Sequence, residues 1–320
     1  MKTDTMNSHS VPTKIRHFID ITDLSAAELR SIIDRAAELK RAMRGKGRGY
    51  VDPARPLADK TLAMIFEKSS TRTRVSFEMA MHQLGGSSIV LQGNDMQLGR
   101  GETIADTARV LSRYVDAIMM RTVKHESILE MAEYGSLPVI NALTNRSHPC
   151  QLMADVQTFE ERKGPLKGKT VAWVGDGNNM AATWIQAAVL FDCEMRIACP
   201  PQYAPRADVL AWAKERQGRI HVTDDPVAAV RRADCVIADT WISMGNTDGE
   251  ARLKALNPYQ VNDKLMAEAS ADALFMHCLP AFRGREVTDG VIDGPHSVVW
   301  DEAENRLHVQ KAILLWCFGR

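Results

Sequence analysis

The segment TLAMIFEKSSTRTRVSFEM, residues 61–79, places an apolar, β-rich run directly before a run with helical spacing. Residues 61–66 favour a buried strand, whereas the apolar positions from residue 75 onward recur as on one face of a helix. Between the two runs, residues 70–74 carry three hydroxyl groups and two guanidinium groups. Because the first N–H groups of a helix lack intrahelical partners, this turn predicts a site for phosphate or another multivalent anion. The alternative is a Ser/Thr helix cap beside two solvated arginines, and the density of donors favours the anion site.

The composition is that of an ordinary globular protein. The chain has 320 residues, of which 45% are apolar and 25% are charged. That length fits two domains of about 150 residues each. Forty basic side chains balance forty acidic ones. The lack of net charge argues against a nucleic acid or a membrane surface as a partner held by bulk electrostatics.

The cysteines and the N-terminal residues bear on the cellular compartment. Six cysteines are scattered along the chain without a C-x-x-C pair, which is typical of reduced thiols in a cytosolic protein. Residues 1–13 are polar, and no apolar run approaches the roughly 18 residues of a membrane span. We therefore expect a cytoplasmic protein that is not inserted in a membrane.

Strand-like and helical runs alternate along most of the chain. A first helix is predicted from a capping box at Ser25 and Glu28 to about Met43. The strands are expected at 61–66, 87–92, 117–121, 138–142, 170–175, 195–199, 219–223, 235–241 and 273–279. The later helices are expected at 73–84, 102–114, 127–134, 149–163, 179–191, 205–217, 226–233, near 258–269 and at 301–317. Repeated βα units predict an α/β fold with two doubly wound parallel sheets.

In doubly wound folds, ligands bind beyond the carboxyl ends of the strands. Chemically capable residues follow several of the predicted strands. They lie at 69–74, 120–122, 145–151, 175–179, 239–245 and 277–280. Together these segments place a cationic, donor-rich first half opposite a second half that carries Asn, Asp, Ser and Cys.

Three of these segments carry a resemblance to a known family. Ser70-Thr71-Arg72-Thr73-Arg74, His148-Pro149-Cys150-Gln151 and His277-Cys278-Leu279-Pro280 occur in the order and spacing of the aspartate/ornithine carbamoyltransferases. Asp239-x-x-x-Ser243-Met244-Gly245 resembles the ornithine branch of that family. The similarity extends over nearly the whole chain.

The resemblance implies both a domain organisation and a reaction. It implies a carbamoyl-phosphate domain at 1–150 and an ornithine domain at 151–304, linked by two helices, with a C-terminal helix at about 305–320 that packs back on the first domain. It implies transfer of the carbamoyl group from carbamoyl phosphate to Nδ of L-ornithine, which yields L-citrulline and phosphate. The amine attacks directly through a tetrahedral intermediate, with no cofactor or metal, and arginine biosynthesis is the expected context.

The resemblance also assigns individual residues. Carbamoyl phosphate is expected to contact Ser70, Thr71, Arg72, Thr73, Gln97, Arg121, His148, Gln151, Cys278, Leu279 and Arg306. Within that set, the expected catalytic residues are Arg72, Arg121, His148 and Cys278. Ornithine is expected to contact Asn179, Asp239, Ser243 and Met244. Taken alone, a histidine before proline is more often a packed turn residue, and a single cysteine is more often a small apolar side chain. The surrounding motifs favour the functional interpretation of both.

The resemblance further implies a homotrimer in which the loop at 92–102 brings Gln97 to a neighbouring subunit's site. A sister enzyme that acts on N-acylated ornithine or putrescine is the main alternative. Aspartate would require an additional cation in the loop at 243–245, and that loop has none. A dinucleotide site at Gly175-x-Gly177 is disfavoured, because Met180 stands where the third glycine of that fingerprint belongs.

Overall fold

The computed structural model describes residues 15–93, 101–242 and 247–320. Its strands form two parallel sheets, which confirms the predicted α/β fold with two doubly wound sheets. The first sheet has the order β2-β1-β3-β4 and the second has the order β7-β6-β5-β8-β9. The first contains β1 (Thr61–Phe66), β2 (Ser87–Gln92), β3 (Ala117–Arg121) and β4 (Val139–Leu143). The second contains β5 (Thr170–Val174), β6 (Glu194–Ala198), β7 (Ile220–Thr223), β8 (Cys235–Ala238) and β9 (Leu274–His277).

The strand order reverses between β1 and β3 in the first sheet and between β5 and β8 in the second. The central strands are apolar on both faces, and residues 62–66 of β1 are all buried, as expected when helices cover both sides of a parallel sheet. A ligand crevice forms at such a reversal, outside the carboxyl ends of the strands. Four of the segments singled out above follow β1, β3, β5 and β8, the strands beside the two reversals.

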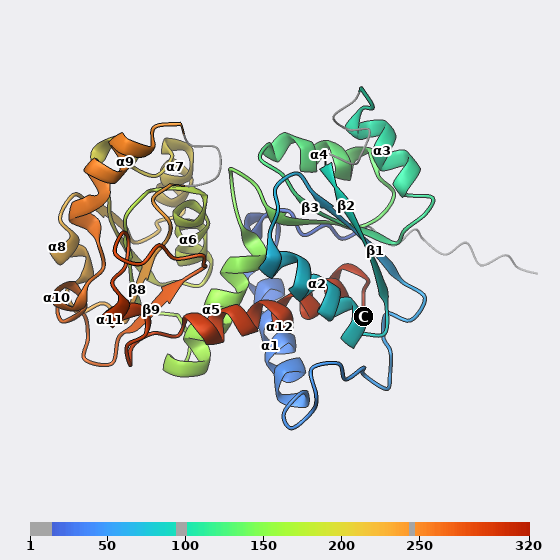
Figure 1. The fold of residues 1–320 in the computed structure, drawn as a ribbon, viewed down its shortest axis with the longest axis horizontal. Helices are drawn as coiled ribbons and strands as arrows, with labels where there is room; N and C mark the ends of the chain where they lie inside the picture. The colour runs from blue at the N-terminus through green and yellow to red at the C-terminus, as the bar shows by residue number, and fades with distance from the viewer. Residues whose placement is uncertain (1–14, 94–100, 243–246) are drawn as a thin grey trace, which may run out of the picture.

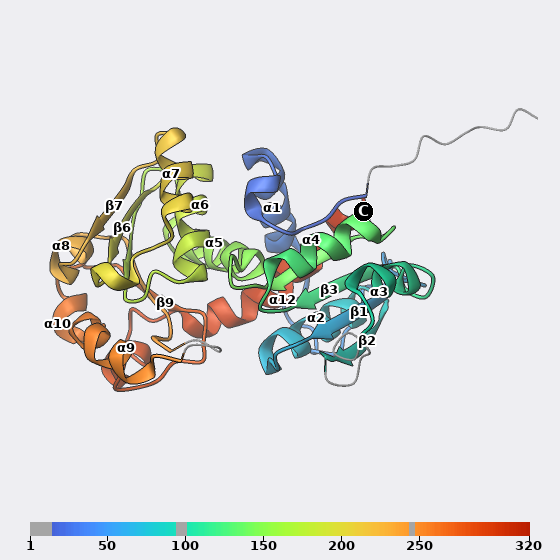
Figure 2. The ribbon, with the colours of Figure 1, turned by 90° about the horizontal axis from the view of Figure 1, so that it is seen from above.

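The helices cover the sheets and connect the two halves. They are α1 (Ala26–Ala42), α2 (Thr71–Gln83), α3 (Ile104–Leu111), α4 (His125–Tyr134), α5 (Pro149–Lys163), α6 (Asn179–Leu190), α7 (Ala207–Glu215), α8 (Pro226–Val230), α9 (Gly249–Leu256), α10 (Asp263–Met266), α11 (Asp289–Ile292) and α12 (Val299–Cys317). In Figures 1 and 2 the sheets stand at opposite ends of the molecule, with α5 and α12 between them. The last helix, α12, packs against α1, α2 and α5. Two long helices thus join the sheet-bearing halves.

Local chemistry explains where several helices begin. The capping box predicted for α1 is confirmed, since Ser25 Oγ accepts from Glu28 N at 3.2 Å and Ser25 N donates to the Glu28 carboxylate at 2.9 Å. The helix predicted near 258–269 is confirmed only over Asp263–Met266, and the rest of that prediction was wrong. That segment contains a short 3-10 turn at 257–259 and a new helix from residue 263, where Asn262 caps Leu265 N at 3.1 Å. Pro258 lacks the N–H that a continuous helix would need.

The short helices α9 and α11 were not predicted, because neither carries an extended apolar periodicity. Among the described helices, none combines the length and the apolar character that a membrane span requires.

Candidate active site

The turn after β1 brings the predicted anion-binding residues to the N-terminus of α2. Ser70 is the N-cap: its Oγ accepts from Thr73 N at 3.3 Å and donates to Thr73 Oγ1 at 3.0 Å. Thr71 is exposed, whereas Arg72 is half-buried and Thr73 is buried. Ser70 is therefore a helix cap, as the alternative to an anion site supposed. The start of α2 is nevertheless still rich in hydrogen-bond donors.

Arg121 and Arg306 come to this turn from β3 and α12. Only 8% of Arg121 and 4% of Arg306 is exposed. Arg306 Nη2 donates to Thr73 Oγ1 at 2.8 Å, and its Nη1 donates to Gln151 Oε1. The Nε atoms of both arginines are buried, and neither has a hydrogen-bond partner among the described residues. The contacts of Arg306 are thus with neutral groups, and donor capacity remains for an anion.

The charges of the arginines interact. Burial, together with the nearby Arg306 guanidinium, lowers the pKa of Arg121 to about 10, and Arg72 contributes to the same shift. Burial also lowers the pKa of Arg306, and Arg72 again contributes. Both groups remain cationic near neutral pH. Three guanidiniums that repel one another in a largely buried position favour a multivalent anion between them.

His148 is the N-cap residue of α5, and 3% of it is exposed. Its backbone N–H donates to Thr183 Oγ1 at 3.1 Å, and its Nδ1 has no partner among the described residues. Burial, and then the positive charges of Arg306 and Arg121, lower the pKa of His148 well below its ordinary value. The imidazole is therefore neutral at neutral pH, and it can still donate one hydrogen bond through one ring nitrogen.

Gln151 lies one turn further along α5, and protein groups engage both ends of its amide. Its Nε2 donates to Asp155 Oδ1 at 2.8 Å and to Glu302 Oε1 at 2.9 Å, while its Oε1 accepts from Arg306. The structure thus places Gln151 beside Arg306, another of the residues expected to contact carbamoyl phosphate. A direct contact between Gln151 and the carbamoyl group stays a prediction.

Asp239 and Cys278 meet at the ends of β8 and β9. Asp239 Oδ1 accepts from Thr240 N at 2.7 Å and from Cys278 Sγ at 3.1 Å. Burial and the Asp239 carboxylate raise the pKa of the Cys278 thiol well above its ordinary value. Cys278 is consequently a neutral thiol that donates a weak hydrogen bond, not a thiolate nucleophile.

Asn178 is a functional candidate that sequence reasoning passed over. It caps α6, with Oδ1 accepting from Met180 N at 2.8 Å, and its Nδ2 donates to Asp239 Oδ2 at 2.7 Å. The sequence carried one signal for this role, because Asn178 directly precedes the helix predicted from residue 179 and so occupies the N-cap position. The neighbouring Asn179 is half-buried and donates from Nδ2 to Thr144 O at 2.9 Å, so it contacts the turn after β4.

The turn after β9 has an unusual backbone. Leu279 has a φ of 56°, a left-handed conformation that costs a residue other than glycine roughly 1–3 kcal/mol. Its N–H donates to His277 Nδ1 at 2.9 Å. This contact holds the turn that carries Cys278. The predicted role of the Leu279 carbonyl stays a prediction.

Asp239, His277 and Cys278 are the described residues closest to a metal-ligand set, with one ligand atom from each lying within 4.8 Å of the others. Of the two ring nitrogens of His277, Nδ1 accepts from Leu279 N and Nε2 lies 3.4 Å from the Glu286 carboxylate. A metal would have to displace those contacts and deprotonate a thiol whose pKa is raised. The set therefore fits a resident metal poorly.

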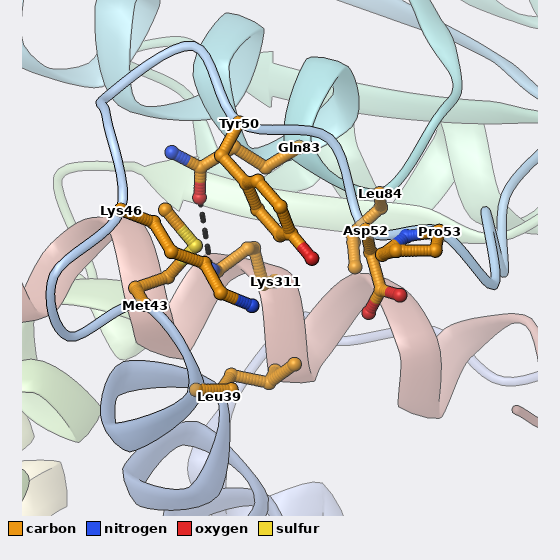
Figure 3. Close-up of a pocket in the computed structure, with 10 residues that line it drawn as sticks. Leu39, Met43, Lys46, Tyr50, Asp52, Pro53, Gln83, Leu84 and Lys311 are labelled. Atoms are coloured by element: carbon orange, nitrogen blue, oxygen red, sulfur yellow. Dashed lines mark hydrogen bonds between the residues drawn. The ribbon is translucent and has the colours of Figure 1, made fainter.

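Gln97, Ser243 and Met244 lie outside the described residues. A separate pocket of about 260 Å³ lies between α1, α2, α12 and the loop after α1, and none of the predicted site residues lines it. Figure 3 shows Lys311 at this pocket, hydrogen-bonded from Nζ to Gln83 Oε1 at 2.9 Å. That hydrogen bond links α2 to α12, and α12 is the helix that carries Arg306.

Two family models match successive parts of the chain. Residues 16–161 match the aspartate/ornithine carbamoyltransferase carbamoyl-P binding domain, and residues 167–317 match the Asp/Orn binding domain. An ornithine carbamoyltransferase of Rhodopseudomonas palustris (strain BisA53) is 59% identical over 304 residues, which cover 95% of this chain and 97% of that protein. An ornithine carbamoyltransferase of Caulobacter vibrioides is 56% identical over 307 residues, which cover 96% of this chain and 99% of that protein.

Solved structures give the same result. Ornithine carbamoyltransferase from Pyrococcus furiosus has a TM-score of 0.88 at 49% identity, covering 94% of this chain and 96% of that chain. Anabolic ornithine carbamoyltransferase from Campylobacter jejuni has a TM-score of 0.87 at 40% identity, covering 95% of this chain and 99% of that chain. The chain therefore belongs to the aspartate/ornithine carbamoyltransferase family.

Proposed function

We propose that this protein is an enzyme that transfers the carbamoyl group of carbamoyl phosphate to Nδ of L-ornithine, with L-citrulline and phosphate as products. The similarity to proteins named ornithine carbamoyltransferase, 59% identical over 95% of the chain, carries the proposal. The geometry supports it, because an anion-binding turn and a carboxylate–thiol pair stand at the switch points of two sheets. The similar proteins favour ornithine over the N-acylated ornithine or putrescine alternatives.

The phosphate of carbamoyl phosphate binds at the N-terminus of α2 in this proposal, between Ser70 to Thr73 and the guanidiniums of Arg121 and Arg306. Charge-assisted hydrogen bonds of this kind contribute about 1.5–3 kcal/mol each. They also stabilise the phosphate as the C–O bond breaks and charge moves onto the leaving group.

His148 then acts as a neutral donor to the carbamoyl oxygen, which becomes an oxyanion in the tetrahedral intermediate. The lowered pKa of this buried imidazole supports donation from a neutral ring. Gln151 and the Leu279 carbonyl complete the proposed carbamoyl contacts. Gln97 completes the phosphate contacts from a neighbouring subunit.

Ornithine binds in the second half of the chain. Asp239 binds the α-ammonium group of ornithine, and Asn179 lies at its α-carboxylate. Ser243 and Met244 belong to the loop that closes over the amino acid. Cys278, hydrogen-bonded to Asp239, helps position the neutral Nδ that attacks the carbamoyl carbon. A new C–N bond forms, the C–O bond to phosphate breaks, and the proton lost by Nδ passes to the departing phosphate, so that citrulline and hydrogen phosphate leave. Holding both substrates in line contributes on the order of 7–11 kcal/mol by proximity, so no covalent enzyme intermediate is required.

We further propose a cytoplasmic homotrimer that acts in arginine biosynthesis, with domains at 1–150 and 151–304 and the last helix returning to the first domain. Subunit hybrids test the shared site. Arg72→Ala and Gln97→Ala variants are each inactive as homotrimers, but mixed trimers recover activity, because one interface then holds both native residues. Mixtures that stay inactive although differently tagged subunits co-purify as hybrid trimers contradict the shared site.

The reaction itself is tested by its stoichiometry. We expect one phosphate released for each citrulline formed, with no carbamoylated protein detected by mass spectrometry after a rapid quench. A stable carbamoyl-enzyme, or phosphate release without citrulline, contradicts the proposed direct attack.

A further inference from the structure

Two acidic side chains lie beneath the site on the helices that connect the halves of the chain. Asp155 on α5 and Glu302 on α12 are 2% and 1% exposed. The Gln151 Nε2 group donates to both, at 2.8 Å to Asp155 Oδ1 and at 2.9 Å to Glu302 Oε1. Two buried carboxyl groups thus accept hydrogen bonds from the same amide nitrogen.

The other partners of this carboxyl pair are also neutral. Trp184 Nε1 donates to Asp155 Oδ2 at 3.1 Å, and His277 N donates to Glu302 Oε2 at 2.9 Å. The nearest guanidinium, that of Arg306, is directed to Gln151 Oε1 and Thr73 Oγ1 instead. Two ionised and buried carboxylates that accept from the same amide group would repel each other strongly.

A shared proton removes that repulsion. Burial raises the pKa of Asp155 to about 7, and burial together with the Asp155 charge raises the pKa of Glu302 well above its ordinary value. The other titratable groups that face the pair are Arg306 on α12, Cys235 on β8 and Cys278 after β9. Burial also raises the pKa of both thiols, so they remain neutral.

We propose that Asp155 and Glu302 share one proton and act as a positioning pair for both substrate sites. Through Gln151 the pair holds Arg306 against Thr73 on the carbamoyl-phosphate side. Through His277 N it holds the turn that carries Cys278 and Leu279. This role rests on the proposed carbamoyl transfer, although the shared proton itself does not.

Loss of the shared proton has a directional consequence. A second negative charge attracts the Arg306 guanidinium toward α5 and away from Thr73, which weakens the anion site. Carbamoyl phosphate affinity therefore falls as the pH rises through the second ionisation of the pair. Glu302→Gln and Asp155→Asn each leave one carboxylate, the charge of the singly protonated pair, and neither variant can undergo that ionisation.

An infrared pH titration of the ligand-free protein tests the proton directly. The wild-type protein shows a protonated-carboxyl band that disappears at alkaline pH, and Glu302→Gln and Asp155→Asn lack it. Glu304→Gln, which changes a partly exposed residue of the same helix, retains it. A band that is absent from the wild type, or unchanged in Glu302→Gln, overturns the proposal even if carbamoyl transfer is demonstrated.

Kinetics test the positioning role. We expect Glu302→Gln to leave KM for carbamoyl phosphate within about 3-fold of the wild-type value near neutral pH, because it keeps the charge of the singly protonated pair. It also removes the alkaline rise in that KM, whereas Glu304→Gln behaves as wild type. A Glu302→Gln profile that keeps the wild-type alkaline rise overturns the positioning role, because a merely structural defect would leave the shape of the profile unchanged.

Discussion

Replacement of Arg306 by lysine tests the anion site through its best-defined contact. Arg306 donates through Nη2 to Thr73 Oγ1 at 2.8 Å and through Nη1 to Gln151, and its buried Nε has no partner among the described residues. A lysine ammonium is a single point donor that cannot reproduce the planar fork across these positions.

The expected size of the effect follows from the lost contact. One charge-assisted hydrogen bond to the bound phosphate is worth about 1.5–3 kcal/mol. At about 1.4 kcal/mol per tenfold, that loss corresponds to roughly 10- to 150-fold weaker binding of carbamoyl phosphate. Calorimetric titration with inorganic phosphate and the KM for carbamoyl phosphate measure this loss independently.

Arg74→Lys is the matched control. Arg74 lies on the same helix as Thr73, but its side chain is 50% exposed and pairs with Glu78 at 3.1 Å. Exposed pairs of this kind contribute about 1 kcal/mol or less, so we expect less than about a 5-fold change in KM. An Arg306→Lys protein that is folded and binds phosphate like wild type would refute the role assigned to this cluster.

Three further predictions concern other parts of the molecule. Arg72→Lys loses most of its activity because the ammonium cannot span the phosphate oxygens; steady-state rates near those of wild type would contradict its phosphate role. Cys278→Ala lowers kcat and raises KM for ornithine more than it raises KM for carbamoyl phosphate, because the thiol contacts Asp239 on the amino-acid side; equal effects on both KM values would count against that placement. Burial lowers the pKa of Lys311 from 10.5 to about 8, so the native state binds fewer protons than the unfolded state between these values. The wild-type stability relative to Lys311→Met therefore rises with pH across that range, by on the order of 1–3 kcal/mol in urea unfolding, and a flat difference would contradict the shift.

The strands and the anion-binding turn were predictable because they depend on local patterns. Buried parallel strands such as β1 appear as short apolar runs, and chemically capable residues at their carboxyl ends follow from topology. The segment at 257–266 was mispredicted because its helical pieces are too short to show a period, and a proline and a capping asparagine decide its course.

The pairing of Asp155 with Glu302 could not be predicted from local sequence patterns. Asp155 and Glu302 are separated by 147 positions, and each stands in a helix where single acidic residues are usually solvated. Only the packing of α5 against α12 brings them to one amide group. The lowered pKa of His148 likewise depends on burial and then on the charges of Arg306 and Arg121, which come from other elements.

The most direct test of the central claim is an acceptor panel with purified protein at a fixed concentration of carbamoyl phosphate. We predict that kcat/KM for L-ornithine, measured as citrulline formed, exceeds the values for N-acetylornithine, putrescine and L-aspartate. Faster carbamoylation of any of those three acceptors, or no citrulline from L-ornithine, would contradict the account.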